Sequence, residues 1–439
     1  MGEETKVSKY AATAVGLGAI IGAGIFVLSG TAIALAGPEA LIAFILVGIV
    51  AMIVAFELGE LGSIMPGSKG SSYSFVYKAF GSEIGFVTGI LLYFSLSTSI
   101  SVISLGFGAY MAGLLGLTTQ MSHILIAIGL IFVLAIVNLL GIRKAANADM
   151  VLVIIKIGVL LAFIGFSMLL LFGGRTSSSN FALNPSTSGI APIFAASIAI
   201  FFAYSGFQAI SSFTSRIRGG SKAAARAILY SVVISMVLYV LVTFSLMIMA
   251  PASSFKISGD PLSTALQYAH APQWLNLLVV FGALVATTSA SLAMMLGASR
   301  LLYQLSADHL LPGYLRRFNR KSDVAVNGVI ISAVIGAVML FSGNIYTIAA
   351  ISNFGLLFSY LMSGLAVMHF RRKGVMSEVR MPLYPYLTIV ATIMLIAFIY
   401  GMPQIAITVG ISMALGLFVF YYMMREAKDK KVIRIKLFR

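Results

Sequence analysis

Cysteine is absent from the 439 residues of this chain. The chain can therefore form no disulfide, and it has no thiolate to act as a nucleophile or metal ligand. The four histidines, at positions 123, 270, 309 and 369, show no spacing typical of metal ligands. No phosphate loop of the GxxxxGK[ST] type is present, so ATP-driven pumping is not indicated. The sequence predicts neither a metal nor a cofactor.

Charged residues are also scarce. They make up 10% of the chain, whereas a soluble domain has about 25%. Hydrophobic residues make up 60%, and the mean hydropathy is +1.03. The first apolar run lacks a small-residue cleavage site followed by polar sequence, so we interpret it as a retained span and not as a signal peptide. These features are typical of a multi-pass membrane protein.

Twelve apolar runs are long enough to be interpreted as membrane spans. They cover residues 11–36, 40–64, 83–115, 121–141, 148–173, 190–215, 224–249, 274–300, 326–342, 347–370, 383–400 and 405–424. The segment 65–78 ends in an amphipathic stretch, and the long connection 250–273 has room for a short helix. The sequence predicts an all-α integral membrane protein with 12 transmembrane helices.

Acidic residues number 13 against 29 Lys and Arg, and the basic residues are unevenly distributed. If the N-terminus is cytoplasmic, all but three of these 29 fall on the cytoplasmic side; the exceptions are Arg175, Lys256 and Lys156. Basic loops stay in the cytoplasm during insertion, so we predict that both termini are cytoplasmic, with the plasma membrane as the default location. Membrane lipid is an expected partner. Nucleic acid is not, because no basic stripe is interleaved with aromatic residues.

Two spans carry small residues in mid-run. The first contains Gly22-Ala23-Gly24 within GAIIGAGIFVLSG (18–30), and the sixth contains Ser205-Gly206 within FFAYSGF (201–207). These spans are five apart, so the two halves of the chain would insert with opposite orientation. Interrupted spans at matching positions indicate an inverted-repeat transporter and its binding site. The alternative is that the glycines only allow close packing of helices.

An unwound helix in lipid leaves backbone N–H and C=O groups without partners, at a cost of several kcal/mol for each group. Such a break persists only if something satisfies those groups. Free N–H groups at a helix start suit a carboxylate, and free carbonyls suit an ammonium. A site that offers both fits a zwitterion, and we therefore expect an α-amino acid as the substrate.

Four motifs resemble those of the amino acid–polyamine–organocation (APC) superfamily of permeases. They are GAIIGAGIFVLSG, FELGELGSIMPGSKGSSYSFVYKAFG (56–81), FFAYSGFQAISS (201–212) and SRLLYQLSADHLLP (299–312). The resemblance covers nearly the whole chain and implies a LeuT-type fold, in which two inverted repeats of five spans precede two further helices. The repeats would be residues 1–173 and 174–373, and residues 374–439 would hold the last two spans and a basic cytoplasmic tail.

The resemblance also implies roles for individual residues. The N–H groups of Gly22, Ala23 and Gly24 would bind the substrate carboxylate, and Gly206 would leave the sixth span open. Carbonyls near Ile20, Ile21, Phe202 and Ala203 would accept the ammonium. Phe202 also matches the family's aromatic gate, although an ordinary packed aromatic is the alternative.

Several positions depart from the family pattern. Ser215-Arg216 replaces two glutamates, Gly220 a proline, Gln208 an aspartate, and Ser95 a glutamate of some relatives. The lost carboxylates disfavour cationic substrates. A pocket lined by Ser95, Ser99, Ser205 and Asn353 suits neutral amino acids of broad specificity.

Lys156 lies inside the fifth span, where a lysine costs at least ~2.5 kcal/mol on insertion scales and is a functional candidate by default. In sodium-independent relatives, a lysine here occupies the place of sodium. That position would lie near the carbonyls of Gly18 and Ile21. Three hydroxyl groups of the eighth span would line its other side, those of Thr287, Thr288 and Ser289. We hypothesise that Lys156 couples transport to a proton. The alternative is a structural lysine that pairs with Asp149 or a carbonyl.

Glu57 and Glu60 are the carboxylates closest to span interiors, and Glu60 matches a family glutamate that braces the inner loop or relays protons. The sequence thus favours a secondary active transporter that moves amino acids with protons by alternating access, and not an enzyme. A sodium- and proton-independent amino acid exchanger is the alternative. A channel or a sensor would keep the same binding site but would lose coupling.

Overall fold

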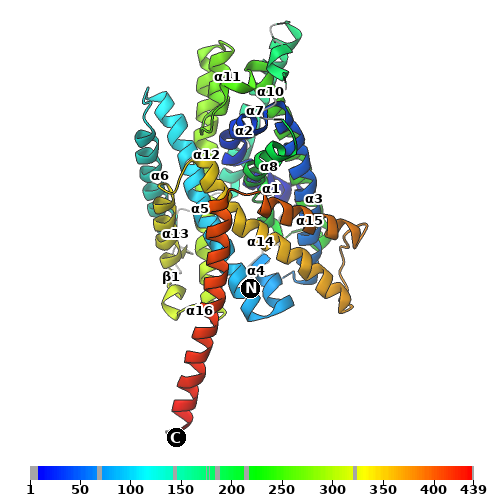
Figure 1. The fold of residues 1–439 in the computed structure, drawn as a ribbon, viewed down its shortest axis with the longest axis vertical. Coiled ribbons are helices and arrows are strands. Elements are labelled where there is room, and N and C mark those ends of the chain that lie inside the picture. Colours follow the sequence, from blue (N-terminus) through cyan, green and yellow to red (C-terminus); the bar gives the residue numbers. More distant parts are fainter. Residues whose placement is uncertain are drawn as a thin grey trace.

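The structure is a computed structural model that describes residues 8–66, 72–141, 146–174, 176, 178–182, 188–211, 217–319 and 324–437. Within these ranges the chain is almost entirely helical. Figure 1 shows long helices side by side in one bundle, with the last helix, α16, extending beyond the others.

The first half of the chain begins with a span divided in two. Its elements are α1 (Lys9–Ile20), α2 (Ala23–Ala36), η1 (Gly37–Glu39), α3 (Ala40–Ile64), α4 (Ser72–Phe80), α5 (Ser82–Leu114), α6 (Gln120–Leu140), α7 (Ala146–Phe172) and η2 (Ser178–Phe181). The amphipathic stretch at the end of the segment 65–78 forms the helix α4. The other elements follow the predicted spans closely, because apolar runs of this length satisfy their backbone groups best as helices.

The second half also begins with a divided span. Its elements are α8 (Ile190–Tyr204), α9 (Gln208–Ser211), α10 (Gly220–Met249), η4 (Ala252–Ser254), α11 (Pro261–Tyr268), α12 (Gln273–Ala307), η5 (Gly313–Arg316), β1 (Phe318–Asn319), β2 (Val324–Ala325), α13 (Val326–Met339), α14 (Ile345–Arg372), α15 (Tyr386–Tyr400) and α16 (Gln404–Leu437). The helix α11 lies in the long connection where a short helix was expected. The short antiparallel pair β1–β2 was not predicted, and its two-residue strands carry little sequence signal.

Eight helical stretches of the described chain are long and apolar enough to cross a membrane. The first of them, Ala23–Ile64, contains both α2 and α3, and three shorter apolar helices are α8, α13 and α15. The all-helical, multi-pass class is therefore confirmed. The figure of 12 crossings remains a prediction.

The helices differ in what covers them. Among the long helices, α5 and α14 are the most buried, and they pack against each other. Large apolar side chains on α6, α7 and α16 are exposed, among them Phe132, Phe172 and Leu415. In water such surfaces would be unfavourable, so they are the faces that lipid would cover.

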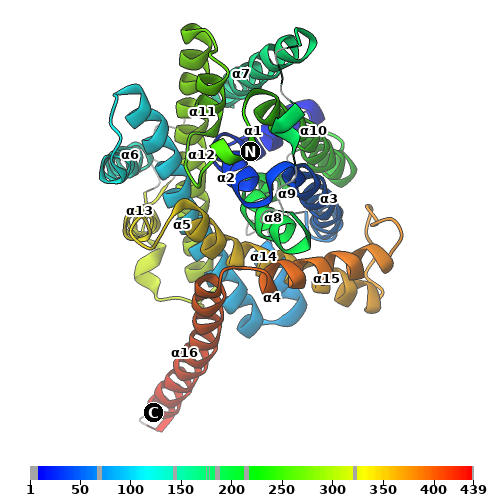
Figure 2. The same ribbon diagram turned by 45° about the horizontal axis from the view of Figure 1, so that its top comes forward.

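Both divided spans lie in the interior. Figure 2 shows α1 and α2 in the middle of the bundle, beside α8 and α9. The helix α2 packs on α8, and α1 packs on α10. The fold therefore brings the two breaks together inside the bundle.

Candidate functional site

The two helix breaks contact each other through glycines. A Cβ atom added at Gly24 would lie 2.2 Å from the Ala203 Cα of α8. A Cβ added at Gly206, which has a φ of +120°, would lie 2.6 Å from the Ala19 carbonyl oxygen of α1. Each break therefore requires a residue without a side chain where it meets the other span.

The first break lies slightly earlier than predicted. The helix α1 ends at Ile20 and α2 begins at Ala23, so Ile21 and Gly22 form the break and Gly24 belongs to the first turn of α2. Gly22 is the N-cap of α2, and no described side chain caps the first turn. The Gly22 N–H itself donates to the Ile20 carbonyl oxygen at 2.7 Å, so it is not open to a substrate carboxylate as predicted. The N–H groups of a first helical turn have no partner within their helix. This end of α2 is therefore suited to bind an anion inside the bundle.

The hydroxyl of Tyr239 on α10 links the two breaks. Its oxygen lies 2.7 Å from the Ile20 carbonyl oxygen and 3.1 Å from the Ala203 carbonyl oxygen, so its single O–H is shared between the two. The side chain is fully buried and packs edge-on against Tyr204 at 5.2 Å between ring centroids. Ile20 and Ala203 are two of the residues whose carbonyls were predicted to accept a substrate ammonium. Sequence analysis missed Tyr239, because nothing distinguishes it from other tyrosines in apolar spans.

The second break has partners from its own chain segment. The backbone N–H and the hydroxyl of Ser205 both donate to the Phe202 carbonyl oxygen, at 3.2 and 2.7 Å. The Gly206 N–H donates to the Gln208 side-chain oxygen at 2.9 Å. That oxygen also accepts from the Tyr360 hydroxyl of α14 at 2.7 Å. Gln208 replaces an aspartate of the family pattern, and in the structure its side-chain oxygen stabilises the break.

The predicted polar lining joins three helices. The Ser99 hydroxyl on α5 lies 2.9 Å from the Ser352 hydroxyl on α14, and Ser352 donates to the Ser95 carbonyl oxygen at 2.9 Å. Asn353 donates from Nδ2 to the Ile198 carbonyl oxygen of α8 at 2.5 Å. Its Oδ1 is buried and accepts no hydrogen bond from a described residue. Of these predicted residues, Asn353 therefore offers an open acceptor.

Phe202 is 4% exposed, so the predicted gate residue is packed inside the protein. Ser215 and Arg216, which depart from the family pattern, lie outside the described residues. Gly220 is the first residue of α10.

Lys156 is buried on α7 and is only 2% exposed. Its ammonium donates to the Gly18 carbonyl oxygen at 3.3 Å. The helices α1 and α7 are in close contact at this point. A Cβ added at Gly18 would lie 2.5 Å from the side chain of Val153, which is on the same face of α7 as Lys156. The structure thus brings together two of the residues predicted for coupling, Lys156 and Gly18.

The predicted hydroxyls of α12 form bonds within their own helix. Thr287 donates to the Ala283 carbonyl oxygen at 2.7 Å, and Ser289 donates to the Ala286 carbonyl oxygen at 3.1 Å. Thr288 is half-buried. The helix α12 nevertheless reaches the first break, since a Cβ at Gly22 would lie 3.0 Å from the Ala290 methyl carbon. The side chain of Asp149, the alternative partner of Lys156, lies outside the described residues.

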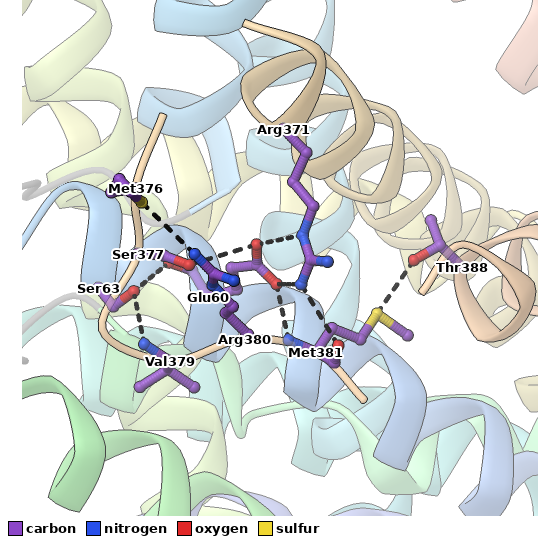
Figure 3. A network of polar contacts seen from close by, with 9 residues as sticks. All are labelled: Glu60, Ser63, Arg371, Met376, Ser377, Val379, Arg380, Met381 and Thr388. Carbon is purple, nitrogen blue, oxygen red and sulfur yellow. Dashed lines mark hydrogen bonds and ion pairs between the residues drawn. The ribbon is translucent and has the colours of Figure 1, made fainter. Parts of the chain in front are cut away.

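Glu60 lies at the centre of a polar network shown in Figure 3. The Arg371 guanidinium donates to both of its carboxylate oxygens at 2.7 Å, and the Met381 N–H donates to one of them at 2.8 Å. Arg371 also stacks over the Tyr384 ring at 4.2 Å. The network joins α3, α14 and the connection to α15. A carboxylate held in this way fits the bracing role better than the proton relay.

Comparison with known proteins assigns the chain to a protein family. Its residues 8–424 match the family described as amino acid permease. The chain belongs to this family. It is therefore a membrane permease for amino acids and not an enzyme.

Two bacterial relatives have nearly the same length as this chain, and a plant relative is longer. The permease is 26% identical to the methylthioribose transporter of Bacillus subtilis, over 96% of this chain and 93% of that protein. It is 28% identical to the branched-chain amino acid permease BcaP of Lactococcus lactis, over 95% and 94%. It is 26% identical to the mitochondrial cationic amino acid transporter 3 of Arabidopsis thaliana, over 84% and 63%. The names of these relatives differ in substrate, so the relatives support the transporter class more strongly than any one substrate.

Proposed function

We propose that this permease is a secondary active transporter that moves neutral amino acids together with protons by alternating access. The observation that carries the proposal is the pair of interior helix breaks, packed on each other through Gly24 and Gly206. Breaks five spans apart fit a LeuT-type arrangement of 12 spans, with repeats at 1–173 and 174–373 followed by 374–439. In this arrangement both termini are cytoplasmic, and the host membrane is the plasma membrane.

The substrate would bind between the breaks. Its carboxylate meets the N–H groups of Ala23 and Gly24, where no described side chain competes for them. Its ammonium meets the Ile20 and Ala203 carbonyls, which the Tyr239 hydroxyl already holds close together. Phe202 closes the site above the substrate. The carboxylate thus supplies partners for the start of α2, and the ammonium would share the Ile20 carbonyl with the Gly22 N–H and the Tyr239 hydroxyl.

A neutral substrate fits the side chains near the breaks. Ser205, Gln208 and Asn353 carry no charge, and a cationic side chain needs a carboxylate to offset its desolvation. The match to permeases named for branched-chain amino acids supports this choice. Relatives named for cationic amino acids and for methylthioribose define the substrates that must be compared.

Lys156 would couple the proton to this cycle. In its charged form the ammonium donates to the Gly18 carbonyl oxygen and holds α1 on α7. Loss of the proton weakens that hydrogen bond and releases α1, whose C-terminal end forms the first break. Movement of α1 and movement of the proton are thereby linked.

Uptake into proteoliposomes tests the proposal. The panel contains labelled neutral and cationic amino acids and methylthioribose, under an inward proton gradient and then an inward sodium gradient. We expect proton-driven accumulation of neutral amino acids that is lost in Lys156→Met. Lys256→Met is the matched control, because Lys256 is an exposed lysine outside the site, and it should transport normally. Uptake that requires internal amino acid and ignores both gradients would show an exchanger instead.

A further inference from the structure

Glu57 is a buried carboxyl group for which the proposed transport cycle has no role. It lies on α3, nearly one turn before Glu60, and is 1% exposed. Apart from Thr388, no described residue is within hydrogen-bonding reach of its carboxylate oxygens. Its chemistry differs from that of Glu60, which is held by three donated hydrogen bonds at 2.7–2.8 Å.

Two other helices cover the Glu57 carboxyl. On α14, a Cβ at Gly364 would lie 3.1 Å from both carboxylate oxygens, so the carboxyl packs against bare backbone. On α15, the Thr388 hydroxyl is the one described donor near the carboxyl, and its single proton is shared with the Met381 sulfur, 3.0 Å away. The contact surface therefore shields the carboxyl from water and replaces at most one of the hydrogen bonds that water would supply.

The surrounding charges do not compensate a negative Glu57. Glu60 on the same helix is the charge that acts on it, and that charge is of the same sign. Arg371 on α14 directs its guanidinium to Glu60 and to the Met381 carbonyl oxygen. Tyr384, from the connection to α15, stacks on that guanidinium. An ionised carboxylate without a counter-charge is among the most costly groups to bury, whereas a neutral carboxylic acid is far less costly.

We propose that Glu57 is a second proton-binding site of this permease, which holds a proton as long as α14 and α15 close over it. The bound form is a neutral carboxylic acid. If α14 or α15 moves away from α3, water reaches the carboxyl, the proton passes to that water, and a carboxylate remains. The site is separate from Lys156, which lies on α7 and contacts α1. It does not depend on the transport proposal.

Infrared difference spectroscopy of the purified full-length permease tests this site at neutral pH. A neutral carboxylic acid has a C=O stretching band that an ionised carboxylate lacks. We expect wild type to show a band that disappears in Glu57→Gln and in Glu57→Met. Glu83→Gln is the matched control, because Glu83 is partly exposed and paired with Arg425 at 3.1 Å, and it should leave the band unchanged.

A substitution at Gly364 tests the role of closure. Valine at this position would force α14 away from the carboxyl, so Gly364→Val should weaken or remove the band although Glu57 is present. Gly416→Val on α16 is the control, since no described atom lies within 4 Å of a Cβ at Gly416, and it should keep the band.

Three outcomes would overturn the proposal. Identical spectra for wild type and Glu57→Gln would mean that Glu57 is ionised. Failure of both Glu57→Gln and Glu57→Met to fold would mean that the site requires a negative charge. A band that persists in Gly364→Val would show that closure by α14 does not retain the proton. None of these outcomes depends on whether amino acid uptake is proton-driven.

Discussion

The two helix breaks pack on each other inside the bundle, but they are stabilised differently. At the α8–α9 break, Ser205 and Gln208 supply side-chain partners, and Tyr360 links that break to α14. At the α1–α2 break, no described side chain caps the first turn of α2. The α8–α9 break thus has more side-chain partners than the α1–α2 break, and we propose that N–H groups at the start of α2 remain for a ligand. The following predictions test this asymmetry.

The largest effect is expected where the breaks touch. Gly24→Ala places a methyl carbon 2.2 Å from the Ala203 backbone, so α2 and α8 must separate. Overpacking costs about 1–3 kcal/mol, and contact with rigid backbone belongs at the upper end. We expect uptake to fall by about 100-fold or more, measured as initial rate in proteoliposomes at equal protein density.

Gly165→Ala on α7 is the control for that substitution. No described atom lies within 4 Å of the added carbon, and alanine is the better helix former by about 1 kcal/mol. Its transport should equal that of wild type. If Gly24→Ala also transported normally, the contact between the breaks would have no functional role.

The next largest effect is expected for Tyr239→Phe. This change removes the hydroxyl that the two breaks share and leaves two buried carbonyls with one fewer donor. The loss of a buried hydrogen bond costs about 1–3 kcal/mol, so substrate affinity should fall by about 10- to 100-fold. Isothermal titration of the purified protein measures this affinity. Tyr230→Phe, on an exposed face of the same helix, should bind as wild type does.

A smaller effect on binding is expected for Gln208→Leu. It leaves the Gly206 N–H and the Tyr360 hydroxyl without this acceptor, so the free energy of unfolding should fall by about 1–2 kcal/mol. Because the α8–α9 break is expected to serve structure more than ligand, substrate affinity should change less than in Tyr239→Phe. A larger loss of affinity in Gln208→Leu would reverse the comparison between the two breaks.

The smallest effect is expected for Ser205→Ala. The Phe202 carbonyl still accepts the backbone N–H of residue 205 when the hydroxyl is lost. A typical hydrogen bond contributes about 0.5–1.5 kcal/mol, and this one is partly redundant. Thermal denaturation and uptake should both stay close to wild type. A strong loss of uptake would indicate that the Ser205 hydroxyl contacts the substrate.

Much of the fold could be predicted because lipid reduces the choice of structures to helices. The apolar runs therefore located the helices, and the small residues Gly22 and Gly206 located both breaks to within about one residue. The short pair β1–β2 was missed, because strands this short depend on the ends of the helices that they connect. Lys156 could be singled out because a charge inside an apolar run is costly in lipid.

The sequence could not predict which side chains from different helices would contact each other. Tyr239 and Tyr360 look like other buried tyrosines until the fold places their hydroxyls on the breaks. Glu57 and Glu60 are three residues apart on one helix, but Arg371 reaches only Glu60 in the described contacts. Hydropathy and the placement of small residues act along the chain, and so they determined the membrane class, the helices and the positions of the breaks. Hydrogen bonds and ion pairs depend on distance in space, so only the tertiary structure decided which break has side-chain partners and which carboxyl has no counter-charge.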